Sequence, residues 1–231
     1  MRIEVSLTPA LYPYRTIVSR HATVAVDILR ATTSICAAFQ AGCECVVPLD
    51  SLDDLQRYRS LGFALAAERN GERVGDAEYG NSPTAYLRQD MHGVRLAYST
   101  TNGTVAILKG ADADLTLVGA FANLTAVTER LCREERDVVV LCSGWKNDFC
   151  TEDTLFAGAL IERLGATLKG DAATMALTLW QKAKADPYQY CQNAAHVHRL
   201  RRIGVEEDIP FAFRTDTCPV VPVYQEGRLV L

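Results

Sequence analysis

The 231-residue chain lacks the features that define several protein classes. Its eight cysteines contain no C-x-x-C pair, and no histidine stands at zinc-finger spacing from them. No apolar run approaches the roughly 20 residues needed to cross a bilayer, and the N-terminal segment MRIEVSLTPA has neither the apolar stretch nor the cleavage site of a signal peptide. We therefore expect a cytoplasmic protein with no membrane partner.

Positive charge is also scarce. The chain has 24 Lys and Arg residues against 28 Asp and Glu residues, and the basic residues are spread thinly, so the surface typical of a nucleic-acid-binding protein is missing. The short basic cluster from Arg199 to Arg202 is predicted to be the solvated end of a helix. No nucleic-acid partner is expected.

Without a secretion signal, the cysteines are predicted to be reduced thiols in or near the core. Cys142 stands at a predicted strand end, where either a nucleophile or a small apolar side chain would fit. The second interpretation is favoured, because no histidine partner is recognisable in the sequence. His196 and His198 are two residues apart and would face different sides of a helix, so a shared metal is not expected.

The sequence does have a regular alternation of apolar segments of strand length with amphipathic segments of helix length. With 48% hydrophobic and 23% charged residues, it predicts one α/β domain over residues 1–231, built on a largely parallel or mixed sheet. A mostly helical part runs from Thr151 to Arg202, and segment 219–224 is predicted to be an edge strand because it contains proline. The predicted strands are Ile3–Leu7, Thr23–Ile28, Cys45–Leu49, Ala64–Ala67, Val94–Ser99, Leu115–Val118 and Val138–Cys142, and the predicted helices are Ala31–Ala41, Leu52–Leu61 and Asn123–Glu134.

Several of the apolar segments end in a cluster of polar residues. Because the carboxyl ends of parallel strands lie at one edge of a sheet, these clusters predict one pocket. In the first cluster, a buried strand delivers Asp27 and then Arg30 to a helix start, where Asp can ligate a divalent cation and Arg can bind a phosphate. A simple helix cap at Asp27 stays open as the alternative. A phospho-aspartate signature is incomplete, because Leu29 stands where its second Asp is required.

The later clusters add candidate ligands for a metal and an anion. Glu68 offers a metal ligand and Arg69 a positive charge, whereas Asn81 and Ser82 also fit a helix N-cap. The hydroxyls and backbone N–H groups of segment 99–104 predict an anion site, although neither a Walker A nor a G-x-G-x-x-G motif is present. The pair Glu152 and Asp153 could ligate a metal or only complement a helix dipole. The remaining clusters are Gly119-Ala120-Phe121-Ala122-Asn123 and Cys142-Ser143-Gly144.

The order and spacing of these segments carry a family resemblance. They are VDILRATT at 26–33, Glu68-Arg69, GNSP at 80–83, STTNGT at 99–104, GAFAN at 119–123, CSG at 142–144 and Glu152-Asp153. On them, the chain resembles the 2-phosphosulfolactate phosphatase (ComB) family from Ile3 to Val223, with a departure at Ala67, where Gly is expected. The resemblance implies a three-layer α/β/α fold and a Mg²⁺-dependent phosphatase that converts 2-phosphosulfolactate to 3-sulfolactate on the path to coenzyme M.

The residues themselves suggest how such a phosphatase would work. We predict that Asp27 and Glu68, with Glu152 or Asp153, hold Mg²⁺, and that Arg30 and Arg69 stabilise charge on the phosphate. Both an aspartyl-phosphate at Asp27 and direct attack by water stay open. The residues predicted to bind the small anionic phosphorylated substrate are Thr32, Thr33, Asn81, Ser82, Ser99, Thr100, Thr101, Asn102, Gly103, Thr104, Asn123 and Ser143.

Two other function classes stay in view. A non-catalytic protein that binds an anionic metabolite would bind anions tightly and release no phosphate. A nucleotide-dependent transferase would bind a nucleotide, for which the chain has no recognised motif. The sequence leaves the choice between monomer and homo-oligomer open.

Overall fold

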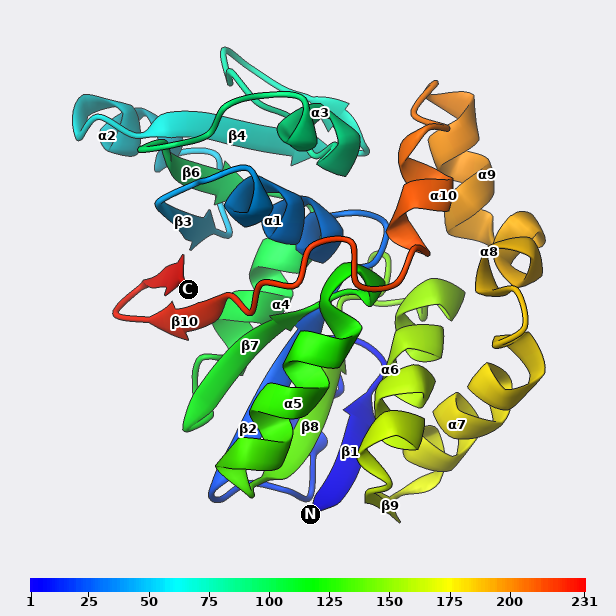
Figure 1. The fold of residues 1–231 in the computed structure, drawn as a ribbon. Coiled ribbons are helices and arrows are strands. Elements are labelled where there is room, and N and C mark those ends of the chain that lie inside the picture. The colour runs from blue at the N-terminus through cyan, green and yellow to red at the C-terminus, as the bar shows by residue number, and fades with distance from the viewer.

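Eleven strands form one mixed sheet, in the spatial order β5-β4-β6-β3-β11-β10-β7-β2-β8-β1-β9. The computed structural model describes every residue from Met1 to Leu231 (Figure 1). The strands are β1 (Arg2–Ser6), β2 (His21–Val26), β3 (Cys45–Leu49), β4 (Ala64–Arg69), β5 (Glu72–Arg73), β6 (Arg95–Ser99), β7 (Leu115–Gly119), β8 (Asp137–Cys142), β9 (Thr167–Lys169), β10 (Val223–Gln225) and β11 (Arg228–Val230). The helices are α1 (Ala31–Gln40), α2 (Leu55–Ser60), α3 (Pro83–Leu87), α4 (Gly103–Gly110), α5 (Leu124–Glu134), α6 (Thr151–Leu164), α7 (Asp171–Ala183), α8 (Pro187–Tyr190), α9 (Ala195–Arg202) and α10 (Asp208–Ala212), with short 3-10 helices η1 (Tyr12–Tyr14), η2 (Phe121–Asn123) and η3 (Cys191–Asn193).

The longer strands form two parallel blocks. One block contains β4, β6 and β3, and the other contains β7, β2, β8, β1 and β9. The seven predicted strands all form, and β3 has the predicted limits. The prediction of a largely parallel or mixed sheet is therefore confirmed.

A C-terminal hairpin joins the two blocks. β10 pairs antiparallel with β7, and β11 pairs antiparallel with both β10 and β3. The prediction of an edge strand over 219–224 is wrong, because the hairpin lies inside the sheet. Both Pro219 and Pro222 precede β10, so neither removes a donor from a ladder, and the carbonyl of Pro222 accepts the N–H of Val118.

The twist of the sheet brings the carboxyl ends of the two blocks together. β10 and β11 are antiparallel to each other, and each is antiparallel to the block beside it, so the two blocks run in opposite directions. Their carboxyl ends would therefore lie at opposite edges of a flat sheet. Five steps separate β6 from β2, and a rotation of about 20–25° at each step accumulates to roughly 100–125°. In Figure 1, β4 accordingly runs across the view, whereas β1 runs upward, and both point toward the region between α1 and α10.

Helices cover both faces of the sheet and so form the outer layers of a three-layer fold. Along β8, Val139 and Leu141 pack with Ala106 of α4, whereas Val138 and Val140 belong to the main core on the opposite face. That second face is covered by α1, α5 and α6, and Figure 1 shows α4 behind the sheet and α5 in front of it. Successive side chains of this buried strand therefore pack alternately against the helices on the two faces of the sheet.

Glycine ends two of the predicted helices. Gly42 follows α1 with φ +103°, and Gly62 follows α2 with φ +80°. These left-handed conformations carry no Cβ clash in glycine, which is why the chain can leave the helix there. None of the helices combines the length and the apolar character that a bilayer span requires.

Candidate active site

Asp27 lies at the carboxyl end of β2 and is nearly buried, with 6% of its surface exposed. Its Oδ1 accepts the Ala31 N–H at 3.2 Å, and its Oδ2 accepts no hydrogen bond. The Thr32 hydroxyl donates to the Asp27 carbonyl at 2.9 Å and accepts the Asp27 N–H at 3.0 Å, while the Thr33 hydroxyl bonds the Ile28 carbonyl. Thr32 and Thr33 thus hold the turn that presents Asp27.

The charges around Asp27 show which other residues approach it. The pKa of Asp27 is raised to about 6, chiefly by burial and also by the carboxylates of Glu68 and Glu152, against the lowering effects of His196 and of the Ala31 N–H. Asp27 is therefore the meeting point of β2, β4, α6 and α9, although these elements lie far apart in the sequence.

The segment from Ser99 to Thr104 closes over Asp27. A Cβ placed on Gly103 would lie 2.7 Å from Asp27 Oδ2, so only glycine allows this approach. The hydroxyls of Thr100 and Thr104 accept each other's backbone N–H at 3.2 and 3.3 Å, which fixes the turn at the start of α4. The N–H groups of Thr101 and Asn102 have no partner within the chain and remain available for an anion.

Glu68, at the end of β4, has a complete set of partners. Its Oε1 accepts the Gly71 N–H at 2.7 Å and the Thr101 hydroxyl at 2.9 Å, and its Oε2 accepts the Asn81 amide at 3.1 Å. The hydroxyl of Tyr98 in turn donates to Asn81 Oδ1 at 2.7 Å, and burial raises the pKa of Tyr98 well above its usual value. This network ties together the loops that follow β4 and β6.

Two guanidinium groups predicted to bind the substrate make contacts within the chain. Arg30 donates to Asp208 at 2.6 Å and to the Gly71 carbonyl at 2.8 Å, and both members of the Arg30–Asp208 pair are buried. Arg69 donates to Ser99 Oγ at 2.9 Å. Arg30 therefore connects the start of α1 to α10, and Arg69 connects β4 to β6.

Asp208 also receives the predicted residue Ser82. The Ser82 hydroxyl donates to Asp208 Oδ1 at 2.8 Å and accepts the Ala85 N–H at 3.3 Å, so it caps α3 as its alternative interpretation predicted. Asp208 was missed because only its distant position in the fold, and no local pattern, brings it to Arg30.

The neighbours Glu152 and Asp153, at the start of α6, have different surroundings. Asp153 accepts the Ile28 N–H at 2.9 Å and the Gly144 N–H at 3.1 Å, one on each oxygen, and so joins two of the predicted loops. Glu152 Oε1 accepts His196 Nδ1 at 2.8 Å, whereas its buried Oε2 has no partner. Burial by itself raises the pKa of Glu152, but the hydrogen bond and charge of His196 outweigh it and leave the pKa below its usual value.

Asn123 and Ser143 are the last two residues predicted to bind the substrate. The polar atoms of Asn123 are paired within the chain, whereas the hydroxyl of Ser143 is not. The Asn123 amide donates to the carbonyls of Val118 and Val220 and accepts the Ala120 N–H, so it joins the end of β7 to the C-terminal segment. The buried Ser143 hydroxyl has no partner and lines a cavity of about 470 Å³ at the start of α4.

Sequence analysis missed two site residues on α9. The prediction of a solvated helix end holds for the exposed Arg202 but is wrong for Arg199, whose guanidinium stacks 3.7 Å above the centre of the Trp145 ring. Arg199 Nε and Nη1 are buried without partners, and a Cβ on Gly71 would lie 3.2 Å from Nη1. His196 joins Arg199 on this face, since residues three apart share one side of a helix.

All eight cysteines are free, in agreement with the prediction, and Cys132 is the exposed one. Burial raises the pKa of the Cys142 thiol well above its usual value. An uncharged thiol fits the interpretation of Cys142 as a small apolar side chain at the end of β8.

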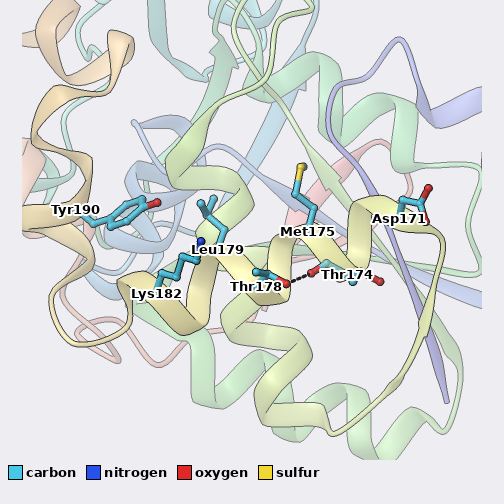
Figure 2. A pocket seen from close by; sticks show the side chains of 7 residues that line it. All are labelled: Asp171, Thr174, Met175, Thr178, Leu179, Lys182 and Tyr190. Carbon is cyan, nitrogen blue, oxygen red and sulfur yellow. Dashed lines mark hydrogen bonds between the residues drawn. The ribbon is translucent and has the colours of Figure 1, made fainter.

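A second hollow lies along α7, away from these charges. It has a volume of about 410 Å³, and its walls carry one carboxylate and one amine (Figure 2). None of its residues belongs to the cluster around Asp27. Its lining residues are Asp171, Thr174, Met175, Thr178, Leu179, Lys182 and Tyr190.

The fold and the cluster around Asp27 together define a class of protein, the α/β enzymes whose strand ends gather buried carboxylates, guanidinium groups and an amide-rich turn to handle a small charged substrate. A family model described as 2-phosphosulpholactate phosphatase matches residues 7–227. The chain belongs to this family, and its class is therefore that of the phosphoric monoester hydrolases.

Individual relatives are similar in sequence to this chain along almost their whole length. A protein of Parasynechococcus marenigrum (strain WH8102) is 37% identical over 218 residues, covering 90% of each chain. A protein of Thermotoga petrophila (strain ATCC BAA-488 / DSM 13995 / JCM 10881 / RKU-1) is 30% identical over 208 residues, covering 90% of this chain and 91% of its own. Each carries the name "Probable 2-phosphosulfolactate phosphatase".

Proposed function

We propose that this protein hydrolyses the phosphate ester of 2-phosphosulfolactate to give 3-sulfolactate and phosphate, with Mg²⁺ as cofactor. The names of the relatives support the substrate, and the chemistry of the Asp27 cluster supports the reaction. The observation that carries the proposal is the free Oδ2 of Asp27, a carboxylate oxygen without a hydrogen-bond partner that lies beside the Gly103 turn and its unpaired N–H groups. We further place the reaction in the cytoplasm and on the path to coenzyme M.

The donor atoms fit Mg²⁺, which prefers oxygen ligands and binds through one or two carboxylates together with substrate phosphate. Asp27 Oδ2 and Glu152 Oε2 are carboxylate oxygens without hydrogen-bond partners, and Glu68 adds a third negative charge nearby. Asp153 has both oxygens engaged by backbone N–H groups and would act by positioning the loops. When bound, Mg²⁺ supplies positive charge for the phosphoryl oxygens.

The remaining residues would bind and orient the substrate. The unpaired N–H groups of the turn at Thr101 and Asn102 would bind phosphoryl oxygens, and Arg199 would direct its free nitrogens at the negative charge of the bound ester. Arg30 and Arg69 would act from their places beside this turn, either on the substrate or on the loops that bind it. Ser143 would offer its free hydroxyl to a second anionic group of the substrate.

The test is phosphate release from 2-phosphosulfolactate and from a panel of other 2-phospho-hydroxyacids, each with Mg²⁺ and with a chelator. Release that needs Mg²⁺ and is confined to the sulfonate substrate is the expected result. Release from the other esters would keep the phosphatase chemistry and contradict the substrate. Tight binding of the esters without any release would support the non-catalytic binding protein instead.

A further inference from the structure

Three metal-binding side chains of different kinds meet at the edge of the proposed magnesium site, with which they share Glu152. They are Cys150 at the N-cap of α6, Glu152 in its first turn and His196 on α9, and all three are buried, with His196 the most exposed at 8%. One donor atom from each lies within 4.8 Å of the other two. We propose that this cluster is a second metal site, selective for a thiophilic divalent cation such as Zn²⁺ over Mg²⁺.

The spacing of the donor atoms suits a tetrahedral ion. Cys150 Sγ and His196 Nδ1 lie 3.7 Å apart, and bonds of about 2.3 Å to sulfur and 2.0–2.1 Å to nitrogen at a tetrahedral angle place these atoms roughly 3.5 Å apart. His196 Nδ1 and Glu152 Oε1 lie 2.8 Å apart and would have to separate by about half an ångström. Small side-chain rotations therefore convert the hydrogen-bonded cluster into a ligand set.

The chemistry of the donors selects the ion. Thiolate and imidazole suit Zn²⁺, whereas Mg²⁺ requires oxygen ligands, so Cys150 and His196 discriminate against the cofactor proposed for the reaction. Cys150 stands at the N-cap of the 14-residue α6, where the partial positive charge of the helix N-terminus favours the thiolate once an ion is bound. Glu152 would bind this ion through Oε1, since its unpaired and buried Oε2 is the oxygen proposed for Mg²⁺.

A cavity supplies access and room for a fourth ligand. It has a volume of about 480 Å³, and the three donors share its wall with Trp145 and Arg199. Three protein ligands and an open position filled by water are the arrangement of accessible zinc sites in proteins. The ion would therefore reach the cluster without unfolding of α9.

Binding requires a balanced movement of protons. The Cys150 S–H proton leaves to solvent as the metal–sulfur bond forms, and the imidazole proton moves from Nδ1 to Nε2 so that the Nδ1 lone pair binds the ion. Nε2 faces Arg199, which must then turn away along the Trp145 ring. Arg199 therefore opposes metal binding, and Arg199→Met should raise the affinity.

Cobalt reports directly on the proposed ligands. Chelator-treated full-length protein titrated with Co²⁺ should develop a near-ultraviolet thiolate-to-cobalt charge-transfer band that saturates at one equivalent of thiolate-bound Co²⁺ and is lost on addition of Zn²⁺ but not of Mg²⁺. Cys150→Ser should remove the band and weaken Co²⁺ binding by more than the roughly 10–100-fold that follows from loss of an outer partner of a ligand. The matched control is Cys132→Ser, which removes the exposed thiol and should keep the band.

The two cysteine variants decide between a metal bound at Cys150 and a metal bound elsewhere on the chain. A band that survives in Cys150→Ser, or disappears in Cys132→Ser, overturns the proposal, as does the absence of stoichiometric binding by the wild-type protein. If Cys150→Ser fails to fold, X-ray absorption at the zinc edge of the wild-type protein decides, because one sulfur ligand with nitrogen and oxygen ligands is required. None of these readouts depends on phosphatase activity.

Discussion

The two sides of the active site differ in how completely their polar atoms are paired. On the side of β4 and β6, the buried residues Glu68, Asn81 and Tyr98 form a hydrogen-bonded chain. On the side of β2, α6 and α9, Asp27 Oδ2 and buried atoms of Glu152 and Arg199 have no hydrogen-bond partner. Buried polar groups are normally paired, so we propose that the ligand binds on the unpaired side and that the paired side holds the surrounding loops in place.

The largest effect should come from Asp27→Asn on the unpaired side. The variant loses a negative charge that no neighbour can replace, so we expect kcat/KM for the phosphate ester to fall by about 10³-fold or more, which corresponds to roughly 4 kcal/mol of barrier. Phosphate release measured with saturating Mg²⁺ checks this. Asp171→Asn, which changes an exposed carboxylate on α7, should retain activity. Wild-type turnover by Asp27→Asn would remove Asp27 from the mechanism.

The same substitution should stabilise the metal-free fold in a pH-dependent way. The pKa of Asp27 is raised from 3.8 to about 6, so the folded protein binds this proton more tightly than the unfolded chain and loses stability as pH rises through 6. At about 1.4 kcal/mol per pH unit, Asp27→Asn should gain roughly 3 kcal/mol at pH 8 and nothing at pH 3. Denaturant unfolding in chelator at both pH values measures this gain.

Magnesium provides the control for that prediction. Mg²⁺ bound at the proposed site would bind only the folded protein and should stabilise the wild type at pH 8 far more than the variant. If Asp27→Asn is less stable than the wild type at pH 8 in chelator, Asp27 stabilises the fold. The two sides of the site would then not differ in the way described above.

Arg199→Met should have an intermediate effect, through substrate binding. Methionine keeps an apolar contact with Trp145 but removes the charged donors, so we expect KM to rise by about 10–100-fold, consistent with 1.5–3 kcal/mol for hydrogen bonds to charged groups. Steady-state kinetics measure the change. Arg202→Met, on an exposed position of the same helix, should leave KM within about twofold. Equal effects in the two variants would mean that only the net charge of α9 matters.

The smallest effect should come from Tyr98→Phe on the paired side. Asn81 Oδ1 loses its donor, so the free energy of unfolding should fall by about 1–2 kcal/mol while kcat changes little. Tyr79→Phe is the control, because the Tyr79 hydroxyl makes no hydrogen bond and its ring would still stack on Tyr86. A large loss of kcat without loss of stability would mean that Tyr98 takes part in catalysis. The paired side would then have a catalytic role as well as a structural one.

Much of the site could be predicted from the sequence because strand ends are locally encoded. Asp27 and the turn containing Gly103 each follow a short apolar segment directly, and the structure brings them within contact of one another. Their division into paired and unpaired atoms could not be predicted. Glu152 and Asp153 are neighbours on the first turn of α6, yet only Glu152 keeps a free oxygen, because the partners of Asp153 arrive from two other loops.

The sequence by itself determined the order of strands and helices, the glycine-terminated helices and the polar clusters, because each depends on residues within a few positions of one another. Only the tertiary structure decided that the two parallel blocks run in opposite directions around the central hairpin, and that the twist returns their ends to one place. It also placed His196, Arg199 and Asp208 in the site. These contacts join residues separated by 44 to 178 positions, and such pairings are fixed by packing of the whole chain and leave no local pattern.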